Sequence, residues 1–510
     1  MMIRSILTTA SVILSTSMFA QTAGSLDPTF GTGGKVLTPI SGGDAKAYGI
    51  SIQTDGKIVI SGYSTDGTTG KNFATLRYNS DGSLDTSFGN NGMAINDLQT
   101  GSDDVAYSVA IQSDGKIVVG GSSDNGFDKN AAIIRYKTDG TVDSTFGING
   151  IVLTDFDNNQ QDEIKVVRIH AVTGNIIVGG SSVISSSLAK PVIARYLSNG
   201  TIDSTFNSTG IRLLWIATND NNRSFSLEDL EVVSTGKISA TGWRKNVSTS
   251  ISSEYWACRV LSNGAMDNTF STDGVLAYAD AGGSSYGHAL LLNSNQDLIL
   301  AGTRSYLGDN TYRFLKINQD GTIPATSTFF NITSGIDIAY AIEEDVNGKY
   351  VMAGSTGTST SRAFTILRMS NTAVLDNTFN GSGIVNTVFG SNQMNECFDV
   401  AIQTDNKIVA IGYSGTDIAL ARYLGNDIAT SITENNTSSI AVYPNPVNDA
   451  LMIEMSHTDI NSSYQIIDVT GKVWMQGSIK NKFTSIEVKN LPNGIYFLRT
   501  GKQTQKIVKM

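Results

Sequence analysis

Few residues of this sequence have the type and spacing that catalysis or metal binding requires. The three histidines, His170, His288 and His457, lie far apart and form neither an HExxH nor an HxH pattern. A Ser-His-Asp triad can assemble from distant residues, but no pattern in the sequence indicates one. We therefore interpret each histidine as structural and predict no catalytic residue. An enzyme is the less favoured class, although the sequence leaves it open.

A run of Asp and Asn residues offers the oxygen ligands that calcium prefers. Asp155, Asp157 and Asn159 alternate along it as they would in a calcium loop. The glycine at the sixth position and the glutamate at the twelfth position of an EF-hand loop are lacking. Two interpretations stay open, because turn-forming residues are also expected before a strand. The residues either bind calcium or form a loop without any cofactor.

Three of the four tryptophans, Trp215, Trp243 and Trp256, fall in one stretch of the chain. Aromatic side chains with a polar handle are common at binding surfaces, where their faces can stack against sugar rings. The same stretch departs most from the repeat described below. These tryptophans are therefore candidate residues for binding a glycan. The alternative is that they are core aromatics of a longer repeat unit.

The elements that would position such residues come from a repeat with a period of roughly 60 residues. The stretch from Asp81 to Gly140 shows one unit: an anchor phrase, an alternating strand, an Asp-Gly turn before an apolar strand, and a strand ending in Arg-Tyr. The predicted strands of this unit are Met93–Asn96, Ala106–Gln112, Lys116–Val119 and Ala131–Tyr136, with Gly120-Gly121 stopping the third. No segment has helical spacing of apolar residues over three turns.

Three sequence markers agree on seven units. Anchor phrases begin at Leu26, Leu84, Val142, Ile202, Met266 and Leu375, with a degenerate copy from Ile323 to Phe329. The Asp-Gly-Lys turn with its apolar strand and the closing Arg-Tyr phrase also recur seven times, in full or degenerate form. We expect the anchor Asp to cap local backbone N–H groups. The Arg of the Arg-Tyr phrase should pack its stem along the sheet and pair with a nearby carboxylate.

Seven units of four strands predict an all-β fold, a seven-bladed β-propeller over residues 21–423. An open solenoid and a ring of six or eight blades are the alternatives. The array starts with an anchor strand and ends at Arg422-Tyr423, one strand short of a complete unit. If the anchor strand is the outer strand of each blade, Phe30–Ile40 would complete the last blade, whose other strands lie within 396–423. We predict that the ring closes in this way.

The phrases LDxTFGxxG and DGKIVVGG in these units resemble the delta-60 repeat of bacterial surface and exported proteins. The resemblance covers Leu26 to Tyr423 and is weak around Leu213–Ile216 and Thr322–Phe330. It implies a propeller-like fold. The family carries no agreed activity, so the resemblance transfers no functional residue.

The N-terminal segment indicates export. Residues 1–20 read as a signal peptide, with the positive charge of Arg4, the apolar stretch Ile6–Leu14 and the small residue Ala20 at the cleavage point. The apolar stretch is shorter than the ~20 residues that span a bilayer, so we expect no transmembrane helix in the mature chain. After the repeats, residues 424–439 are polar and read as a linker.

Residues 440–510 form a compact tail whose alternating apolar residues predict a small β-sandwich. Its phrases YPNP, DVTG, LPNGIYFLRT and TQKIVKM resemble the type A C-terminal sorting domain of the type IX secretion system. This resemblance implies engagement with that machinery, transport across a Bacteroidetes-type outer membrane, and often removal of the tail. The expected location is therefore secreted or on the outer-membrane surface.

Composition narrows the partners further. The net charge of −10 and the pI near 4.9 argue against a nucleic-acid surface. Cys258 and Cys397 form neither a disulfide framework nor a metal spacing, and we expect them to be buried thiols. We predict an exported binding or scaffold module that meets a glycan or a surface protein. The alternative is an extracellular hydrolase or lyase that acts on polysaccharide at the propeller channel.

Overall fold

The computed structural model divides the chain into two compact units, one ending at Ile428 and one beginning at Ala429. The structure describes residues 22–40, 43–65, 67, 70–157, 161–185, 188–214, 222–247, 252–280, 282–325, 327–390, 393–426, 440–455, 462–500 and 503–510. No α-helix occurs in these ranges, and strands dominate, as the turn and alternation patterns predict. The predicted signal peptide, residues 1–20, and most of the predicted linker lie outside them.

The first unit consists of seven four-stranded antiparallel sheets, the blades. In the first six blades the strands follow chain order from the innermost strand outward. The first three blades contain β2 (Ala45–Ile52), β3 (Ile58–Thr65), β4 (Lys71–Tyr78) and β5 (Met93–Asn96); β6 (Asp103–Ile111), β7 (Ile117–Asp124), β8 (Lys129–Tyr136) and β9 (Ile151–Thr154); and β10 (Gln161–Ile169), β11 (Ile176–Ser185), β12 (Leu188–Tyr196) and β13 (Ile211–Leu213).

The next three blades have the same strand order. They contain β14 (Arg223–Val232), β15 (Ile238–Asn246), β16 (Glu254–Val260) and β17 (Val275–Tyr278); β18 (Ser284–Leu292), β19 (Leu298–Tyr306), β20 (Asp309–Ile317) and β21 (Thr328–Phe330); and β22 (Ile336–Glu344), β23 (Tyr350–Gly357), β24 (Arg362–Met369) and β25 (Ile384–Thr387).

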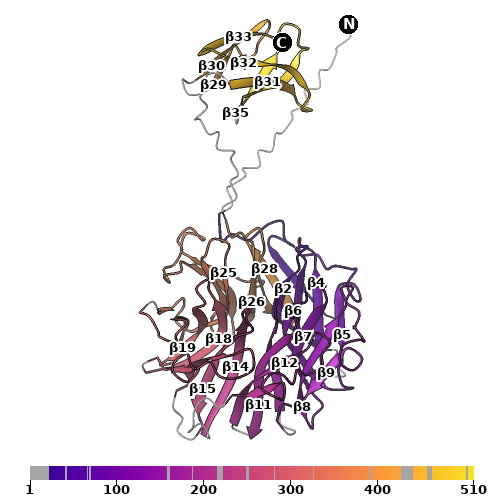
Figure 1. The fold of residues 1–510 in the computed structure, drawn as a ribbon, viewed down its shortest axis with the longest axis vertical. Helices are drawn as coiled ribbons and strands as arrows, with labels where there is room; N and C mark the ends of the chain where they lie inside the picture. The colour runs from indigo at the N-terminus through magenta and orange to yellow at the C-terminus, as the bar shows by residue number, and fades with distance from the viewer. Residues whose placement is uncertain are drawn as a thin grey trace, which may run out of the picture. The chain divides into compact units, whose positions relative to one another are not determined.

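The seventh blade combines strands from both ends of the array. Its inner strands are β26 (Asn395–Ile402), β27 (Ile408–Ser414) and β28 (Asp417–Tyr423), and its outer strand is β1 (Lys35–Thr38). In this antiparallel pair Lys35 lies opposite Ala421 and Thr38 opposite Ile418. Each innermost strand contacts the next, and β26 contacts β2, so the ring is closed; Figure 1 shows the orange β28 beside the indigo β2. The predicted seven-bladed propeller and its closure by Phe30–Ile40 are confirmed.

Each well-formed anchor phrase builds a latch between neighbouring blades. In the first blade Asp85 Oδ1 accepts hydrogen bonds from the backbone N–H and the hydroxyl of Ser87, at 3.1 and 2.6 Å. Arg77 Nε donates to Asp85 Oδ2 at 2.7 Å, and the guanidinium carbon lies 4.6 Å from the centroid of the Phe88 ring. Arg77 Nη1 also donates to the Thr138 carbonyl of the second blade, at 2.6 Å. The expected capping Asp and paired Arg are confirmed.

The same latch recurs around the ring and bridges its closure. Its ion pairs are Arg135–Asp143, Arg195–Asp203, Arg259–Asp267, Arg368–Asp376 and Arg422–Asp27. The last pair joins β28 to the residues that precede β1, so it holds the two ends of the array together.

All seven innermost strands carry a β-bulge at the same position against the second strand. In the second blade Tyr107 is the extra residue, and Gly121 lies opposite the preceding Ala106. A Cβ on Gly121 would lie 1.9 Å from the Val105 carbonyl oxygen, so only glycine fits there. The equivalent glycines are Gly62, Gly180, Gly242, Gly302, Gly354 and Gly412.

The bulge corrects one sequence prediction. Gly120-Gly121 do not stop the apolar strand, because β7 continues through them to Asp124. A glycine inside a strand often marks a bulge or a close backbone approach, and both occur here. The glycine pair therefore marks the point where the second strand lies opposite the bulge of the innermost strand, and not the end of the second strand.

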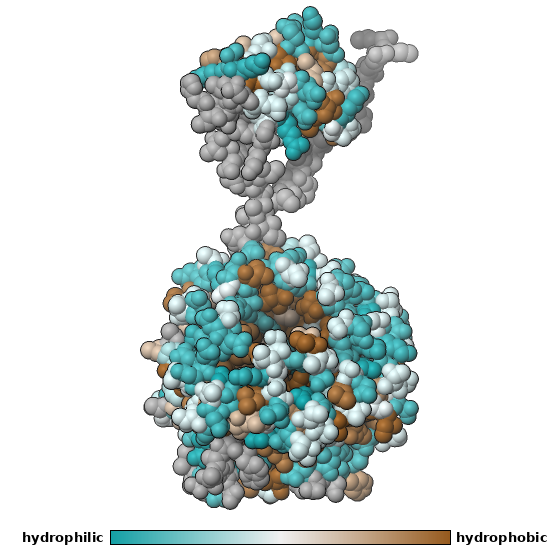
Figure 2. Space-filling view, viewed as in Figure 1, coloured by the Kyte–Doolittle hydropathy of each residue, from teal (hydrophilic) through white to brown (hydrophobic). Residues whose placement is uncertain are grey.

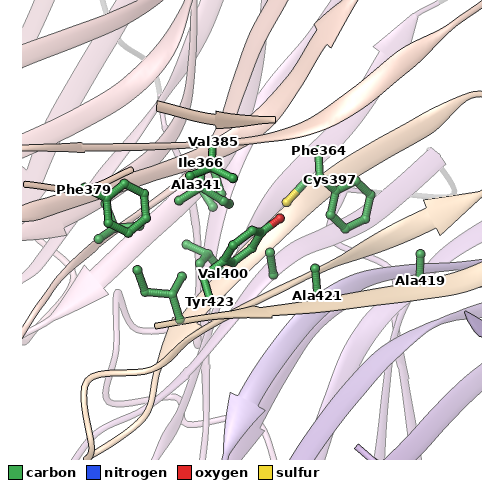
Figure 3. Close-up of a cluster of buried hydrophobic side chains, with 14 of the residues drawn as sticks. Ala341, Phe364, Ile366, Phe379, Val385, Cys397, Val400, Ala419, Ala421 and Tyr423 are labelled. Carbon is green, nitrogen blue, oxygen red and sulfur yellow. The ribbon is translucent and has the colours of Figure 1, made fainter. Parts of the chain in front are cut away.

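Apolar side chains fill the space between blades. Figure 3 shows the cluster between the sixth and seventh blades, where Phe364 and Ile366 of β24 pack with Val400 of β26 and the ring of Tyr423. The Tyr423 hydroxyl donates to Thr387 Oγ1 at 2.8 Å and so keeps a hydrogen bond inside the core. Both cysteines are free, fully buried members of such clusters, as predicted.

The second unit is the predicted β-sandwich, formed by two antiparallel sheets. One contains β29 (Ile440–Tyr443), β30 (Ala450–Met455) and β33 (Phe483–Glu487). The other contains β31 (Ser462–Asp468), β32 (Val473–Ile479), β34 (Gly494–Thr500) and β35 (Gln503–Lys509). Leu451 and Ile453 from the first sheet pack with Ile466 and Leu498 from the second, as alternation places apolar residues on one face of each strand.

Candidate functional site

The seven bulges direct seven side chains into the central channel, one from each blade. A bulge leaves one residue outside the ladder and re-aims its side chain, which here lines the channel cavity. We call these residues the channel belt, and all are half-buried. The channel belt consists of Tyr48, Tyr107, Lys165, Glu228, His288, Tyr340 and Phe398.

One side of the channel belt is aromatic and continuous. The ring centroids of Tyr107 and Tyr48 lie 5.4 Å apart, those of Tyr48 and Phe398 4.8 Å, and those of Phe398 and Tyr340 5.2 Å. The His288 imidazole continues the series 5.3 Å from Tyr340. These tilted and edge-on contacts are the arrangements that aromatic quadrupoles favour. The hollow in the middle of the face shown in Figure 2 likewise has apolar residues gathered around it.

The other side of the channel belt is charged. Lys165 Nζ lies 3.9 Å from the centroid of the Tyr107 ring and 3.1 Å from Glu163 Oε1. Burial opposes its charge, but the carboxylate of Glu163 raises the pKa of Lys165 overall. Glu228 Oε1 accepts hydrogen bonds from Trp243 Nε1 at 3.0 Å and from Ser226 Oγ at 2.5 Å.

A second layer of charged residues lies beyond the channel belt, toward the ends of the innermost strands. Arg168 on β10 donates to Asp229 Oδ1 and to Glu231 Oε1 on β14, both at 2.9 Å. Asp229 also accepts from the backbone N–H of Leu290 in the next blade, at 2.8 Å. Asp399 plays the same part at the ring closure, where its Oδ2 accepts from the N–H of Ile50 at 3.0 Å.

The two layers enclose a cavity of about 340 Å³. Among the described residues, its lining includes five carboxyl groups and two cationic side chains, Lys165 and Arg168, together with the imidazole of His288. Among the parts of the chain that the structure describes, no group donates a hydrogen bond to Glu343 and no cation forms an ion pair with it. Burial and the neighbouring Asp399 and Glu231 raise the pKa of Glu343 to about 8. Burial also raises the pKa of Asp399 to about 6.

The histidines divide between the channel and the blades. His288 belongs to the channel belt, and burial lowers the pKa of its imidazole. His170 is structural as expected, since Nδ1 lies 2.8 Å from Thr173 Oγ1 and Nε2 lies 3.1 Å from the Ser234 carbonyl oxygen of the next blade. His457 lies outside the residues that the structure describes.

The three candidate tryptophans do not form one surface. Trp256 is 1% exposed, packs in the core with Phe225, and donates through Nε1 to the Ser226 carbonyl at 3.1 Å. It therefore offers no face to a ligand. Trp243 is half-buried beside the channel belt, where it positions Glu228. Trp215 lies outside the described ranges.

Asp155 and Asp157 lie directly after β9, at the start of the connection from the second blade to the third. The backbone N–H of Asp157 donates to Asp155 Oδ1 at 3.1 Å, which is a local turn. Asn159 lies outside the described residues. In the ranges that the structure covers, no three His, Cys, Asp or Glu side chains are grouped to hold a metal ion. Calcium binding by this loop stays a proposal.

One serine motif corrects the expectation that no sequence pattern indicates a catalytic serine, and the structure explains it. Gly283–Gly287 has the GxSxG spacing of a hydrolase nucleophile, which stands exposed on a sharp turn between strand and helix. Here Ser285 is fully buried within β18 and donates from Oγ to Asp280 Oδ2 at 3.1 Å. We therefore assign it no catalytic role.

Sequence reasoning missed the channel belt because its members share no residue type. Tyrosine occupies three of the seven positions, and the other four hold Lys165, Glu228, His288 and Phe398, so no single residue type marks the position. The available signal was the glycine in each second strand, which a bulge opposite requires. Pairing that glycine with the alternating strand before it would have located the channel residue of each blade.

Fold and site together define a β-propeller with a lined channel cavity, joined to a small β-sandwich. Residues 441–510 match the family described as a secretion system C-terminal sorting domain. Residues 53–88, 112–146 and 173–206 match the β-propeller family DUF5122, a domain of unknown function. The chain is therefore a propeller protein with a type IX sorting tail, which makes it secreted or located at the cell surface.

The comparisons with curated proteins and solved structures find distant similarity at most. No curated protein matches the chain. An inactive virginiamycin B lyase from Staphylococcus aureus, solved with quinupristin, is 12% identical with a TM-score of 0.43, over 76% of this chain and 98% of that one. An ulvan lyase from a new polysaccharide lyase family is 9% identical with a TM-score of 0.48, over 79% and 99%. Similarity this low carries no argument about activity.

A third structure is PorZ of Porphyromonas gingivalis, described as an essential surface component of the type IX secretion system. It is 9% identical with a TM-score of 0.22, over 96% of this chain and 86% of that chain.

Within the described residues of the present chain, no helix is long and apolar enough to cross a membrane.

Proposed function

We propose that this protein is an exported binding module that presents its channel cavity to a ligand outside the cell. The observation that carries the proposal is the set of seven equivalent bulges, which bring one side chain per blade into a single channel. Bulges are common next to functional sites because they re-aim side chains. The sorting tail supplies the route to the cell surface.

The channel belt suits recognition of a glycan or of a group on a surface protein. Half-buried rings such as Tyr48 and Phe398 keep part of their faces available for stacking, while polar side chains on the other side can fix orientation. A cavity of about 340 Å³ lies at the small end of the roughly 300–1,000 Å³ typical of ligand pockets. It therefore admits one small group of a longer ligand.

A second candidate function is hydrolysis or lysis of a polysaccharide in the channel. The observation that favours it is the convergence of carboxyls with raised pKa values, Glu343 at about 8 and Asp399 at about 6. A carboxyl that stays protonated near neutral pH can act as a general acid. Binding is the preferred function because the other cavity carboxyls with raised pKa values are already engaged, Asp399 by backbone N–H groups and Asp229 by Arg168 and the N–H of Leu290.

The experiment applies the purified full-length chain to a panel of soluble and insoluble polysaccharides, with and without calcium. Retention and the release of new reducing ends are followed together. We expect retention without release, loss of retention in Phe398→Ala, and no change in Phe127→Ala, whose ring is fully exposed in the loop after β7. Retention that Phe398→Ala leaves intact would contradict the channel as the binding site.

The remaining outcomes separate the other readings. Release of reducing ends that disappears in Glu343→Gln would establish the second candidate function. Retention that requires calcium, and that is lost in Asp157→Asn, would make the loop at Asp155 and Asp157 part of the site. Retention on no polysaccharide would leave a surface protein as the ligand class.

A further inference from the structure

The channel cavity has an aromatic wall and an acidic wall, and two neighbouring blades contribute to both. Tyr340 and Glu343 both come from β22, and Phe398 and Asp399 both come from β26. The Tyr340 and Phe398 rings are in edge-on contact, with centroids 5.2 Å apart. The sixth and seventh blades therefore place aromatic faces and carboxyl groups around the same space.

Among the described residues, the two cavity carboxyls on these blades, Glu343 and Asp399, form no ion pair. Arg168 is engaged by Asp229 and Glu231 on the fourth blade, through two hydrogen bonds of 2.9 Å. Asp399 receives only the backbone N–H groups of Ile50 and Val400. In the described residues nothing forms an ion pair with Glu343, although it faces the cavity.

We infer that this cavity binds the ammonium group of an organic cation, between the aromatic rings of Tyr340 and Phe398 and the carboxyl of Glu343. The inference rests on the proposed function and names the class of ligand. Aromatic faces attract ammonium groups, and the attraction strengthens where water is excluded. A carboxylate that lines the same cavity supplies the compensating charge.

A bare metal ion fits this space less well than an organic cation. Calcium needs six to eight oxygen ligands in its first shell. The described residues bring no three acidic, His or Cys side chains together in such a group, and two of the carboxyls are already held by Arg168. Aromatic rings cannot replace those oxygens, whereas they do solvate an alkylammonium group.

The binding has a defined dependence on pH. Glu343 faces Asp399 on β26, Asp229 and Glu231 on β14, and Arg168 on β10, with burial and the carboxyls raising its pKa to about 8. Below that pH Glu343 is neutral and attracts a cation weakly. The affinity for a permanently charged cation should therefore rise between pH 6 and pH 9.

The test uses isothermal titration calorimetry on the purified full-length chain with choline and with its neutral carbon isostere, 3,3-dimethylbutan-1-ol. At pH 9 we expect choline to bind at least about tenfold more tightly than 3,3-dimethylbutan-1-ol, a difference of ~1.4 kcal/mol in binding free energy. Glu343→Gln should remove most of that preference. Glu344→Gln, next along β22 and outside the cavity lining, should keep it. Equal affinities for the two probes, or a preference that survives in Glu343→Gln, would overturn the inference.

Two further ligands show which class of molecule supplies the ammonium group. They also separate failure of the cation inference from failure of the channel as a glycan site. Spermidine represents polyamines, and a hexamer of N,N,N-trimethylglucosamine, compared with the N-acetylglucosamine hexamer, represents amino sugars; both comparisons are made at pH 9, where Glu343 is ionised. A clear preference for either charged ligand supports the inference and identifies the source. Equal binding of the two hexamers that Phe398→Ala abolishes would keep the channel as a glycan site and overturn the cation inference alone.

Discussion

The substitution Glu343→Gln should stabilise the propeller at alkaline pH and leave it unchanged at acidic pH. The pKa of this carboxyl is raised from 4.5 in the unfolded chain to about 8 in the folded one, by burial and by Asp399 and Glu231. Between those values the folded chain holds a proton that the unfolded chain has lost, so stability falls as the pH rises. Above pH 8 the folded chain carries the full cost of a buried, ionised Glu343 carboxylate, and glutamine removes that cost.

The size of the effect follows from the shift. A rise from 4.5 to about 8 is about 3.5 pKa units, and each unit corresponds to about 1.36 kcal/mol, which gives an upper limit near 5 kcal/mol. Glu343 borders a cavity that can hold water, and water in it reduces the penalty. We therefore expect a gain of about 2 kcal/mol at pH 8.5 and less than about 0.5 kcal/mol at pH 4.5.

Urea denaturation at both pH values measures this difference. The matched control is Glu228→Gln, a channel glutamate that accepts hydrogen bonds from Trp243 and Ser226. It should lose stability, because an amide accepts weaker hydrogen bonds than a carboxylate. If Glu343→Gln gains nothing at pH 8.5, the carboxyl is hydrated like a surface group, and the reasoning about the second layer is refuted.

Three further predictions, which use four substitutions, test the fold that builds the channel. Arg422→Ala should lower the free energy of unfolding by about 3–5 kcal/mol and speed hydrogen exchange across Lys35–Thr38. The control Arg77→Ala should lower the free energy of unfolding as much without that local effect. Equal exchange across Lys35–Thr38 in both variants would contradict the closing latch. Burial opposes ionisation of Asp143, but its hydrogen bonds from Thr145 and the charge of Arg135 lower its pKa to about 2. Asp143→Asn should therefore lower the melting temperature at pH 7. In thermal melts this loss should disappear as the pH falls from 4 toward 2, because the wild-type carboxyl is then protonated. Gly121→Ala should cost about 3 kcal/mol or more in urea, because its Cβ would overlap the Val105 carbonyl; a wild-type midpoint would disprove the need for glycine opposite the bulge.

Much of the fold could be predicted because its signals are local. Turn phrases such as Asp81-Gly82 and strands such as Met93–Asn96 are set by residues within a few positions of one another. The closure by β1 followed from counting strands, since the array begins with the strand that its last unit lacks. The latch was partly foreseen for the same reason, because Arg77 and Asp85 lie only eight residues apart.

The candidate site could not be predicted because it is assembled across the ring. Arg168 and Glu343 come from the third and sixth blades, and their neighbourhood depends on the diameter of a closed ring. Trp256 attracted attention as an aromatic in an irregular unit, yet burial in the core decides its role. The sequence predicts a structural role for His288 because its spacing matches no metal or catalytic motif, and a single sequence contains no information about which residue a bulge turns toward the channel.

The most direct test of the central claim is a crystal structure of the full-length chain grown with the tightest ligand from the binding experiments. The account predicts ligand density inside the channel, against Tyr340 and Phe398, with its charged group facing the carboxyl of Glu343. Ligand density on an outer strand or at the loops, with the channel cavity holding only water, would contradict it.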